Sequence, residues 1–196
     1  MAGKDGEIWC DRPAWRGARL SLELFGIIAG VIGVVLVVAE IFTMNRLNRV
    51  EQSFRFVERY SDDVMLAHRM RVASVAEEIN AGLRALGDDV GLNDVQKVQV
   101  LNAYFLTDTP EARENLRSLI RIVRFFEEVA ICEEVGMCHT DVVCQFFTSH
   151  AAQYREDFAH VYETHAQRNA LGDIGAGLAR LASEEEMKCP DIFSDN

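Results

Sequence analysis

Glu127 is the side chain whose position best suits acid–base chemistry. The segment from Pro110 to Glu134 has the spacing of an amphipathic helix. At about 100° per residue, Glu127 falls on the apolar face of that helix, whereas Glu128 faces water. A carboxylate among apolar side chains must be hydrogen-bonded, paired or protonated, because leaving it without a partner is costly.

The next predicted helix offers partners for Glu127. His150, Tyr154 and His165 lie on its apolar stripe, and Arg155 lies at the edge of that stripe. In one interpretation, Glu127 works with His150 and His165 in an enzyme or a metal protein. In the interpretation that we favour, Glu127 is a buried, hydrogen-bonded carboxylate that fixes helix register, because no nucleophile or phosphate-binding loop accompanies it. We therefore assign no catalytic residue.

A second group of reactive side chains consists of cysteines at intervals of six residues. They are Cys132, Cys138 and Cys144, with His139 next to the second. Structural zinc sites use cysteine pairs with shorter spacing. Steps of six also rotate by about 240°, so one helix cannot present all three on one face. We expect no metal site and no cofactor here.

The remaining cysteines, Cys10 and Cys189, bring the count to 5, which is odd. The chain is also too long to resemble a disulfide-dense secreted scaffold, so the sequence favours reduced thiols in a cytosolic domain over disulfides. The spacing Asp157-x-x-His160 occurs in di-iron bundles, but those need two such motifs with further inward-facing glutamates. We therefore expect Asp157 and His160 to be a solvent-exposed pair on the surface.

The element that must position this domain is an apolar run from Leu24 to Ala39. Its sixteen residues would rise about 24 Å as a helix, slightly less than a hydrocarbon core of about 30 Å. Extending the helix over residues 20–44 makes it long enough and leaves Glu23 and Glu40 near the two headgroup regions. The run is long, and no small-residue cleavage site follows it directly, so we predict an uncleaved transmembrane helix.

Three glycines, Gly26, Gly30 and Gly33, share one face of this helix. Such a face lets a second membrane helix approach closely, although glycine is common in membrane helices in any case. We therefore expect the chain to contact the lipid bilayer and, through this face, itself or another membrane protein.

The glycine face continues as a heptad seam through Glu40 into a predicted stalk. The stalk positions of this seam are Leu47, Val50, Phe54 and Val57. A seam of this kind is typical of a left-handed helix pair. A short amphipathic helix that packs on its own domain would give the same pattern, and the sequence leaves both interpretations open.

Beyond the membrane the pattern predicts only helices, so the fold class is all-α with a small bundle. The predicted organisation is a tail (1–19), a transmembrane helix (20–44), an amphipathic helical stalk (45–86), a helical bundle domain (87–188) and a C-terminal tail (189–196). Helix starts are indicated at Thr109-Pro110 and at Thr140 or Asp141, with Gly136 as a left-handed stop. A last helix should run from Gly172-Asp173 to about Lys188.

The formal net charge is −11, and nearly all of it follows the membrane segment. An acidic soluble part repels nucleic acid, so we expect no nucleic-acid partner. Arginines are balanced on the two sides of the segment, so the positive-inside rule does not orient it. Cysteine usage then favours a cytoplasmic C-terminal domain.

The stretch Leu119-Ile-Arg-Ile-Val-Arg-Phe-Phe-Glu-Glu-Val-Ala130, followed by Gly136 and Asp141, resembles a bacterial family labelled domain of unknown function 4760. Phe125, Phe126 and Glu127 match its Phe-Phe-Glu motif. The resemblance implies an N-terminal membrane helix with a helical domain at a bacterial inner membrane, rather than an activity.

Together these observations predict a single-pass, membrane-anchored helical protein that acts in protein–protein interaction or assembly. One alternative is an accessory subunit of a larger membrane complex, in which the glycine face packs on another protein. The other is the enzyme or metal protein built on Glu127 with His150 and His165.

Overall fold

The computed structural model describes residues 13–85, 94–170, 172–187 and 189. Every regular element in these ranges is an α-helix, and no strand occurs in them. The predicted all-α fold class is therefore confirmed. The chain divides into two compact units, residues 1–47 and 48–196, and each is described by itself.

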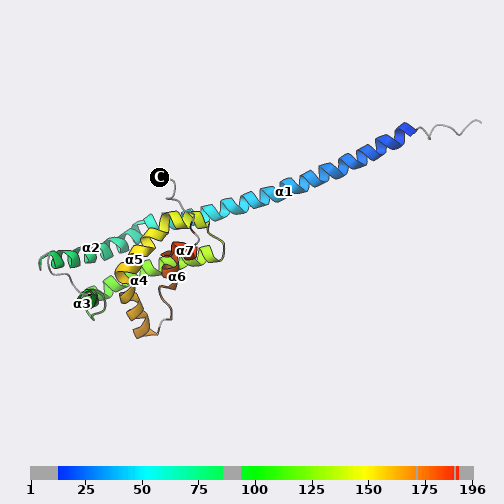
Figure 1. Cartoon of the computed structure of the whole chain (residues 1–196). Helices are drawn as coiled ribbons and strands as arrows, with labels where there is room; N and C mark the ends of the chain where they lie inside the picture. Colours follow the sequence, from blue (N-terminus) through cyan, green and yellow to red (C-terminus); the bar gives the residue numbers. More distant parts are fainter. Residues whose placement is uncertain (1–12, 86–93, 171, 188, 190–196) are drawn as a thin grey trace, which may run out of the picture. The chain divides into compact units, whose positions relative to one another are not determined.

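The helices follow one another along the chain as labelled in Figure 1. They are α1 (Pro13–Ser61), α2 (Asp63–Ala85), α3 (Asp94–Phe105), α4 (Pro110–Glu134), α5 (Thr140–Asn169), α6 (Ala176–Leu181) and α7 (Glu184–Met187). The tail expected over 1–19 overlaps α1 from Pro13 onward, and its first twelve residues lie outside the described part. The expected boundary between the stalk (45–86) and the bundle domain (87–188) also lies outside it.

The first unit contains the part of α1 that precedes Asn48. Large apolar side chains surround this helix and are exposed, among them Phe25 (73%), Val34 (65%) and Leu36 (64%). An 18-residue window in the helix has a mean hydropathy of 2.6, and none of it is buried. A helix that is apolar on every side is typical of a membrane span. It is the one helix of the described chain that is long and apolar enough to cross a membrane.

The second unit begins with the end of α1, where the structure differs from the expected continuous stalk over 45–86. The helix ends at Ser61, and α2 starts at Asp63. The cause is Asp62, whose side chain accepts a hydrogen bond from the backbone N–H of Val64 at 2.7 Å. An aspartate in this role starts a new helix by satisfying an amide at its N-terminus.

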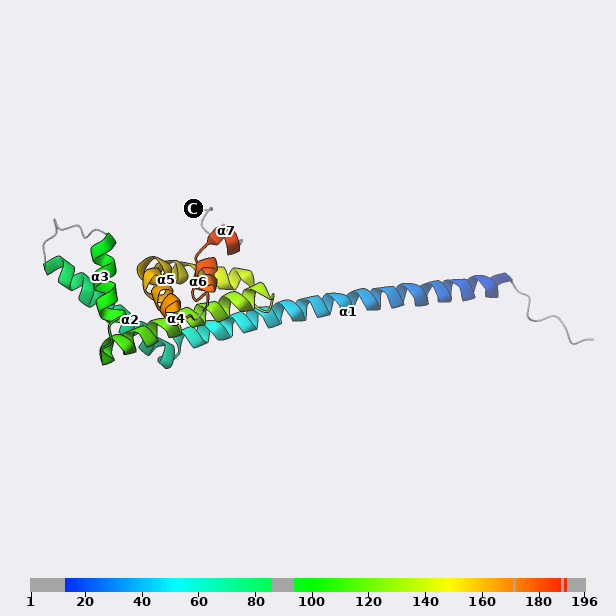
Figure 2. The ribbon, with the colours of Figure 1, turned by 90° about the horizontal axis from the view of Figure 1, so that it is seen from below.

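α4 is the central helix of the second unit, because it contacts α2, α3, α5 and α6 (Figure 2). Its predicted ends are confirmed. The Thr109 hydroxyl accepts a hydrogen bond from the Ala112 N–H at 3.1 Å, and Pro110 occupies the first turn. Gly136 adopts the left-handed conformation, with φ of +70°, directly after the helix.

Aromatic side chains from three helices form the centre of the core. Tyr60 of α1 lies between Phe125 and Phe126 of α4 and Phe147 of α5, with ring centroids 5.4 to 5.9 Å apart. All four residues are at most 6% exposed. Aromatic pairs at this spacing contribute beyond their buried area, so this cluster joins the end of α1 to the bundle.

The C-terminal region differs from the expected single helix between Gly172 and Lys188. It contains two short helices, α6 and α7, and begins later, at Ala176. Gly175 precedes α6 with φ of +103°. α7 has a start of its own, because the Ser183 hydroxyl accepts a hydrogen bond from the N–H of Glu186 at 3.2 Å.

Candidate functional site

Glu127 is half-buried and fully engaged with the backbone that starts α6. Its Oε1 accepts hydrogen bonds from the N–H of Gly175 at 2.7 Å and of Gly177 at 3.1 Å, and its Oε2 accepts a second bond from Gly177 at 3.1 Å. The expectation that Glu127 bonds to side chains of the following helix was wrong. Its hydrogen-bond partners are backbone amides at the start of α6. A carboxylate that accepts such bonds holds a helix terminus in place.

The two histidines considered with Glu127 lie at different places. The ring of His150 packs against Tyr60, with centroids 5.3 Å apart. His165 contacts Asn169 at 3.2 Å and lies beside the arginine-rich side of α4, where Arg124 lowers its pKa in addition to burial. The structure therefore does not unite Glu127, His150 and His165 in one site.

Four of the five cysteines form two disulfides. Cys132 pairs with Cys138 across the end of α4, and Cys144 of α5 pairs with Cys189. The expectation of reduced thiols was wrong for these four, and Cys10 lies outside the described residues. Intervals of six do not share a face of one helix, but here the chain turns back at Gly136 and brings the first two together. No group of three or more metal-ligating side chains occurs among the described residues.

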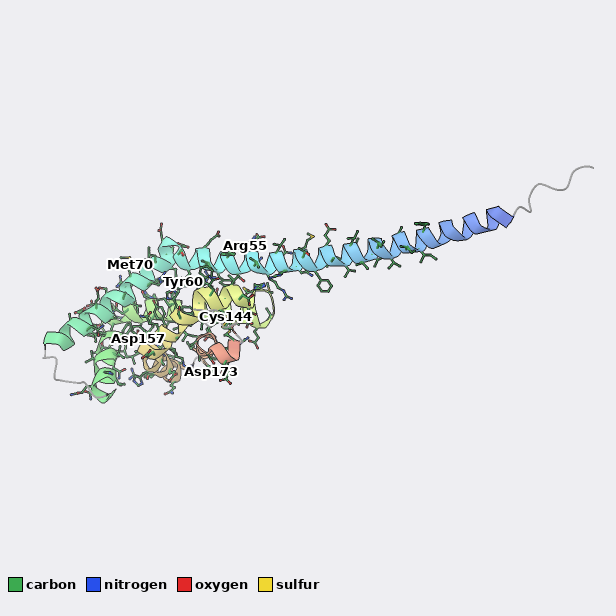
Figure 3. All side chains as sticks on the ribbon, turned by 45° about the horizontal axis from the view of Figure 1, so that its top comes forward. Arg55, Tyr60, Met70, Cys144, Asp157 and Asp173 are labelled. Atoms are coloured by element: carbon green, nitrogen blue, oxygen red, sulfur yellow. A yellow bond between two sulfur atoms is a disulfide. The ribbon has the colours of Figure 1, made fainter. Side chains whose placement is uncertain are left out.

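The side chains that combine charge, hydrogen-bonding capacity and open space lie in a cleft bounded by α1, α2 and α5. We call it the α2–α5 cleft. It has a volume of about 380 Å³. The polar and large side chains that line it include Tyr60, Arg69, Met70, His150, Tyr154 and Asp157. Figure 3 shows Tyr60, Met70 and Asp157 on the three helices.

Arg69 lines this cleft from α2. Its guanidinium stands over the Tyr60 ring, 4.0 Å from the centroid, and donates a hydrogen bond to the Tyr60 carbonyl at 3.3 Å. A cation over an aromatic face is attracted by the ring. The Tyr154 hydroxyl lies beside the same guanidinium. No carboxylate of the described residues forms an ion pair with Arg69.

Tyr60, whose ring lies against the Arg69 guanidinium, carries a buried hydroxyl group. Tyr60 is 6% exposed, and its hydroxyl has no hydrogen-bond partner among the described residues. Burial raises the pKa of Tyr60 to about 12, with a further increase from Tyr154 and a smaller opposing effect of Arg69. The hydroxyl therefore stays protonated, and it is buried within the protein.

The other titratable groups of the cleft are also shifted. Burial, followed by the charge of Arg69, lowers the pKa of His150, so its neutral form is favoured. Burial, followed by Glu156, raises the pKa of Asp157. His160, the partner of Asp157 in the sequence spacing, is exposed and lines a neighbouring hollow. No serine, threonine or cysteine is among the described residues that line the α2–α5 cleft.

Tyr60 and Arg69 were missed in the sequence because they were assigned to one continuous stalk. Nine residues apart, they would lie about 180° from each other on a single helix. The break at Asp62 reverses this by letting α2 fold back over the ring. The one signal for such a break is the acidic pair Asp62-Asp63 after Ser61, which is typical of a helix start.

The predicted membrane face lies on the first unit. A side chain added at Gly26, Gly30 or Gly33 would meet no atom within 4 Å, and Glu40 is exposed as well. This surface has room for another helix.

The stalk seam lies at the start of the second unit and just before it. Leu47 is 62% exposed and Val50 is half-buried. The ring of Phe54 lies 6.0 Å from that of Phe146, and Val57 packs against the core of the second unit. Phe54 and Val57 therefore contact their own domain.

A comparison with known proteins finds no matching family model, no matching curated protein and no matching solved structure. Functional inference therefore depends on the contacts within this chain.

Proposed function

We propose that this chain is a single-pass membrane protein that confines a helical domain to the membrane surface, where the domain acts by binding other molecules. The observation that carries this proposal is the apolar part of α1. Its most apolar 18-residue window has a mean hydropathy of 2.6, and none of that window is buried within the protein. Such a surface is unfavourable in water and favourable in a hydrocarbon core. The segment 20–44 is the proposed span.

The proposed mode of assembly uses the glycine face of Gly26, Gly30 and Gly33. Small residues let two membrane helices approach closely, and close approach supplies their packing energy. The partner is a second copy of this chain or the helix of a larger membrane complex, to which this chain would then be an accessory subunit. The open space at all three glycines supports this proposal.

Cross-linking tests the glycine face. Gly33→Cys, in a Cys10→Ser background, should form a covalent dimer when native membranes are treated with a mild oxidant. Val35→Cys is the matched control, because it lies about 200° away on the same helix. A product of a different mass would identify a heterologous partner. Equal cross-linking of the two variants would contradict a specific glycine interface.

The two disulfides support a location of the domain outside the cytoplasm. Disulfides persist in oxidising compartments and are rare in the cytosol. The earlier expectation of a cytoplasmic domain was based on reduced thiols, and that basis no longer holds. We propose a bacterial inner membrane with the C-terminal domain on the periplasmic side.

Labelling of an introduced thiol tests this orientation. Arg71 is exposed on α2, so Arg71→Cys should react in intact cells with a maleimide that enters the periplasm but not the cytoplasm. Ala2→Cys, in a Cys10→Ser background, should react only after lysis. The reverse pattern would place the domain in the cytoplasm.

A further inference from the structure

The α2–α5 cleft holds charges of both signs that form no ion pair with each other or with another described residue. Arg69 forms no ion pair with a described residue. Asp157 lines the same cleft from α5 and forms no hydrogen bond or ion pair with another described residue. Glu77 lines the cleft from α2. The carboxylate of Asp157 is exposed to solvent. Opposite charges that share a cleft without pairing are open to charges on a ligand.

The hydrogen-bond donors lie at the Arg69 end of the cleft. The guanidinium of Arg69 stands over the Tyr60 ring, beside the Tyr154 hydroxyl. A planar guanidinium with an adjacent hydroxyl is suited to a carboxylate, which accepts bidentate hydrogen bonds from arginine. Burial, followed by the charge of Arg69, lowers the pKa of His150, which disfavours a second cation here.

The acceptors lie about one helical turn further along α5, because Asp157 follows Tyr154 by three residues. A purely anionic ligand at Arg69 would be repelled by Asp157 and Glu77, and a purely cationic ligand at Asp157 would be repelled by Arg69. A ligand with one charge of each sign satisfies both ends. The cleft volume of about 380 Å³ lies at the small end of the range for ligand sites.

We propose that the α2–α5 cleft binds a small zwitterion with a carboxylate and an ammonium group, namely a free amino acid or a short peptide. The carboxylate binds Arg69 and the adjacent Tyr154 hydroxyl, and the ammonium group binds Asp157. Met70 and Phe158 supply apolar surface for the remainder of the ligand. This inference goes beyond the proposed membrane assembly and does not depend on it.

Calorimetric titration of the full chain in detergent tests the proposal. The probes are the twenty protein amino acids, each added separately, and a set of dipeptides made from them. At least one probe should bind with a stoichiometry near one per chain. For that probe, the analogue without the amine and the analogue without the carboxylate should each bind at least tenfold more weakly. Binding of amino acids alone, or of dipeptides alone, decides which of the two sources fills the cleft.

Matched variants locate the binding. Arg69→Gln and Asp157→Asn should each weaken binding at least tenfold. The controls are Arg71→Gln and Glu156→Gln, which remove the same charges from exposed neighbours on the same helices and should leave affinity unchanged. If Arg69→Gln does not fold, Arg69→Lys retains the charge but not the planar geometry and should still weaken binding.

Three results would overturn the proposal. They are the absence of binding by every probe, unchanged affinity in the folded Arg69 and Asp157 variants, and full affinity for an analogue with only one of the two charges. These measurements test ligand binding and not helix association in the membrane. Their outcome is therefore independent of the outcome of the Gly33 cross-linking.

Discussion

Glu127 accepts a hydrogen bond from the backbone N–H of Gly175 at 2.7 Å, across a sequence separation of 48 residues. The contact joins the central helix α4 to the start of α6. It also answers how a carboxylate on a predicted apolar face is tolerated, because two backbone amides satisfy its oxygens. The same contact holds the start of α6 against α4.

Glu127→Gln should lower the free energy of unfolding by about 1–2 kcal/mol, because it removes a charged acceptor from two backbone amides. Chemical denaturation of the purified protein measures the change. Glu128→Gln is the control, since Glu128 is exposed and pairs with Arg59 on the surface at 2.5 Å. Surface pairs contribute little, so this variant should be near wild type. Full stability of Glu127→Gln with loss of a biological activity would favour a functional role for the carboxylate.

Gly175→Ala should destabilise the domain more than Gly172→Ala does. Both glycines have positive φ, +103° and +75°, so alanine at either position introduces backbone strain of about 1 kcal/mol or more. An added side chain at Gly175 would also collide with the Tyr162 ring, whereas Gly172 has open space around it. Thermal unfolding of the two variants gives the comparison. Equal midpoints would show that the Tyr162 ring moves aside without cost.

Loss of the disulfide between Cys144 and Cys189 should destabilise the domain more than loss of the one between Cys132 and Cys138. The sequence separations are 45 and 6 residues. In the chain-entropy account these loops correspond to about 4 and about 2 kcal/mol. Denaturation of Cys189→Ser and Cys138→Ser measures the difference.

The disulfides themselves are counted by alkylation of the unfolded protein. Treatment before and after reduction should differ by four thiols, which mass spectrometry resolves. A difference of zero in freshly purified protein would contradict both pairs and, with them, the basis for placing the domain outside the cytoplasm.

Stability should fall as the pH drops below about 6.5. Burial and Arg69 lower the pKa of His150, and burial and Arg124 lower that of His165. Over this range the unfolded chain takes up protons that the folded chain does not, so the free energy of unfolding decreases until the folded pKa is passed. Denaturation at pH 7.5 and 5.5 measures the decrease.

His150→Gln should reduce this pH dependence, because the variant removes a titrating group that lies beside Tyr60 and Arg69. His160→Gln is the control, since His160 is exposed and should leave the slope unchanged. An NMR titration that places the pKa of His150 above 6.5 would contradict the assigned neutral form.

Several features of this protein follow from the sequence alone. The apolar run that includes Phe25 and Val34 predicts a helix with exposed apolar sides, and Thr109-Pro110 and Gly136 predict the two ends of α4. These signals are local, because each depends on the side-chain period or on the backbone preference of one or two residues. The helical periodicity of apolar residues also indicated that the Glu127 carboxylate needs hydrogen-bond partners.

Only the tertiary structure decided which groups meet. Glu127 accepts hydrogen bonds from the backbone N–H groups of Gly175 and Gly177. A pattern of side chains does not indicate which backbone amides will be donors. The pairing of Cys144 with Cys189 joins segments that are distant along the chain. Arg69 reaches the ring of Tyr60 because a single turn at Asp62 redirects α2. Helix periodicity reports which face of a helix is apolar, but the contacts between helices depend on how the whole chain packs.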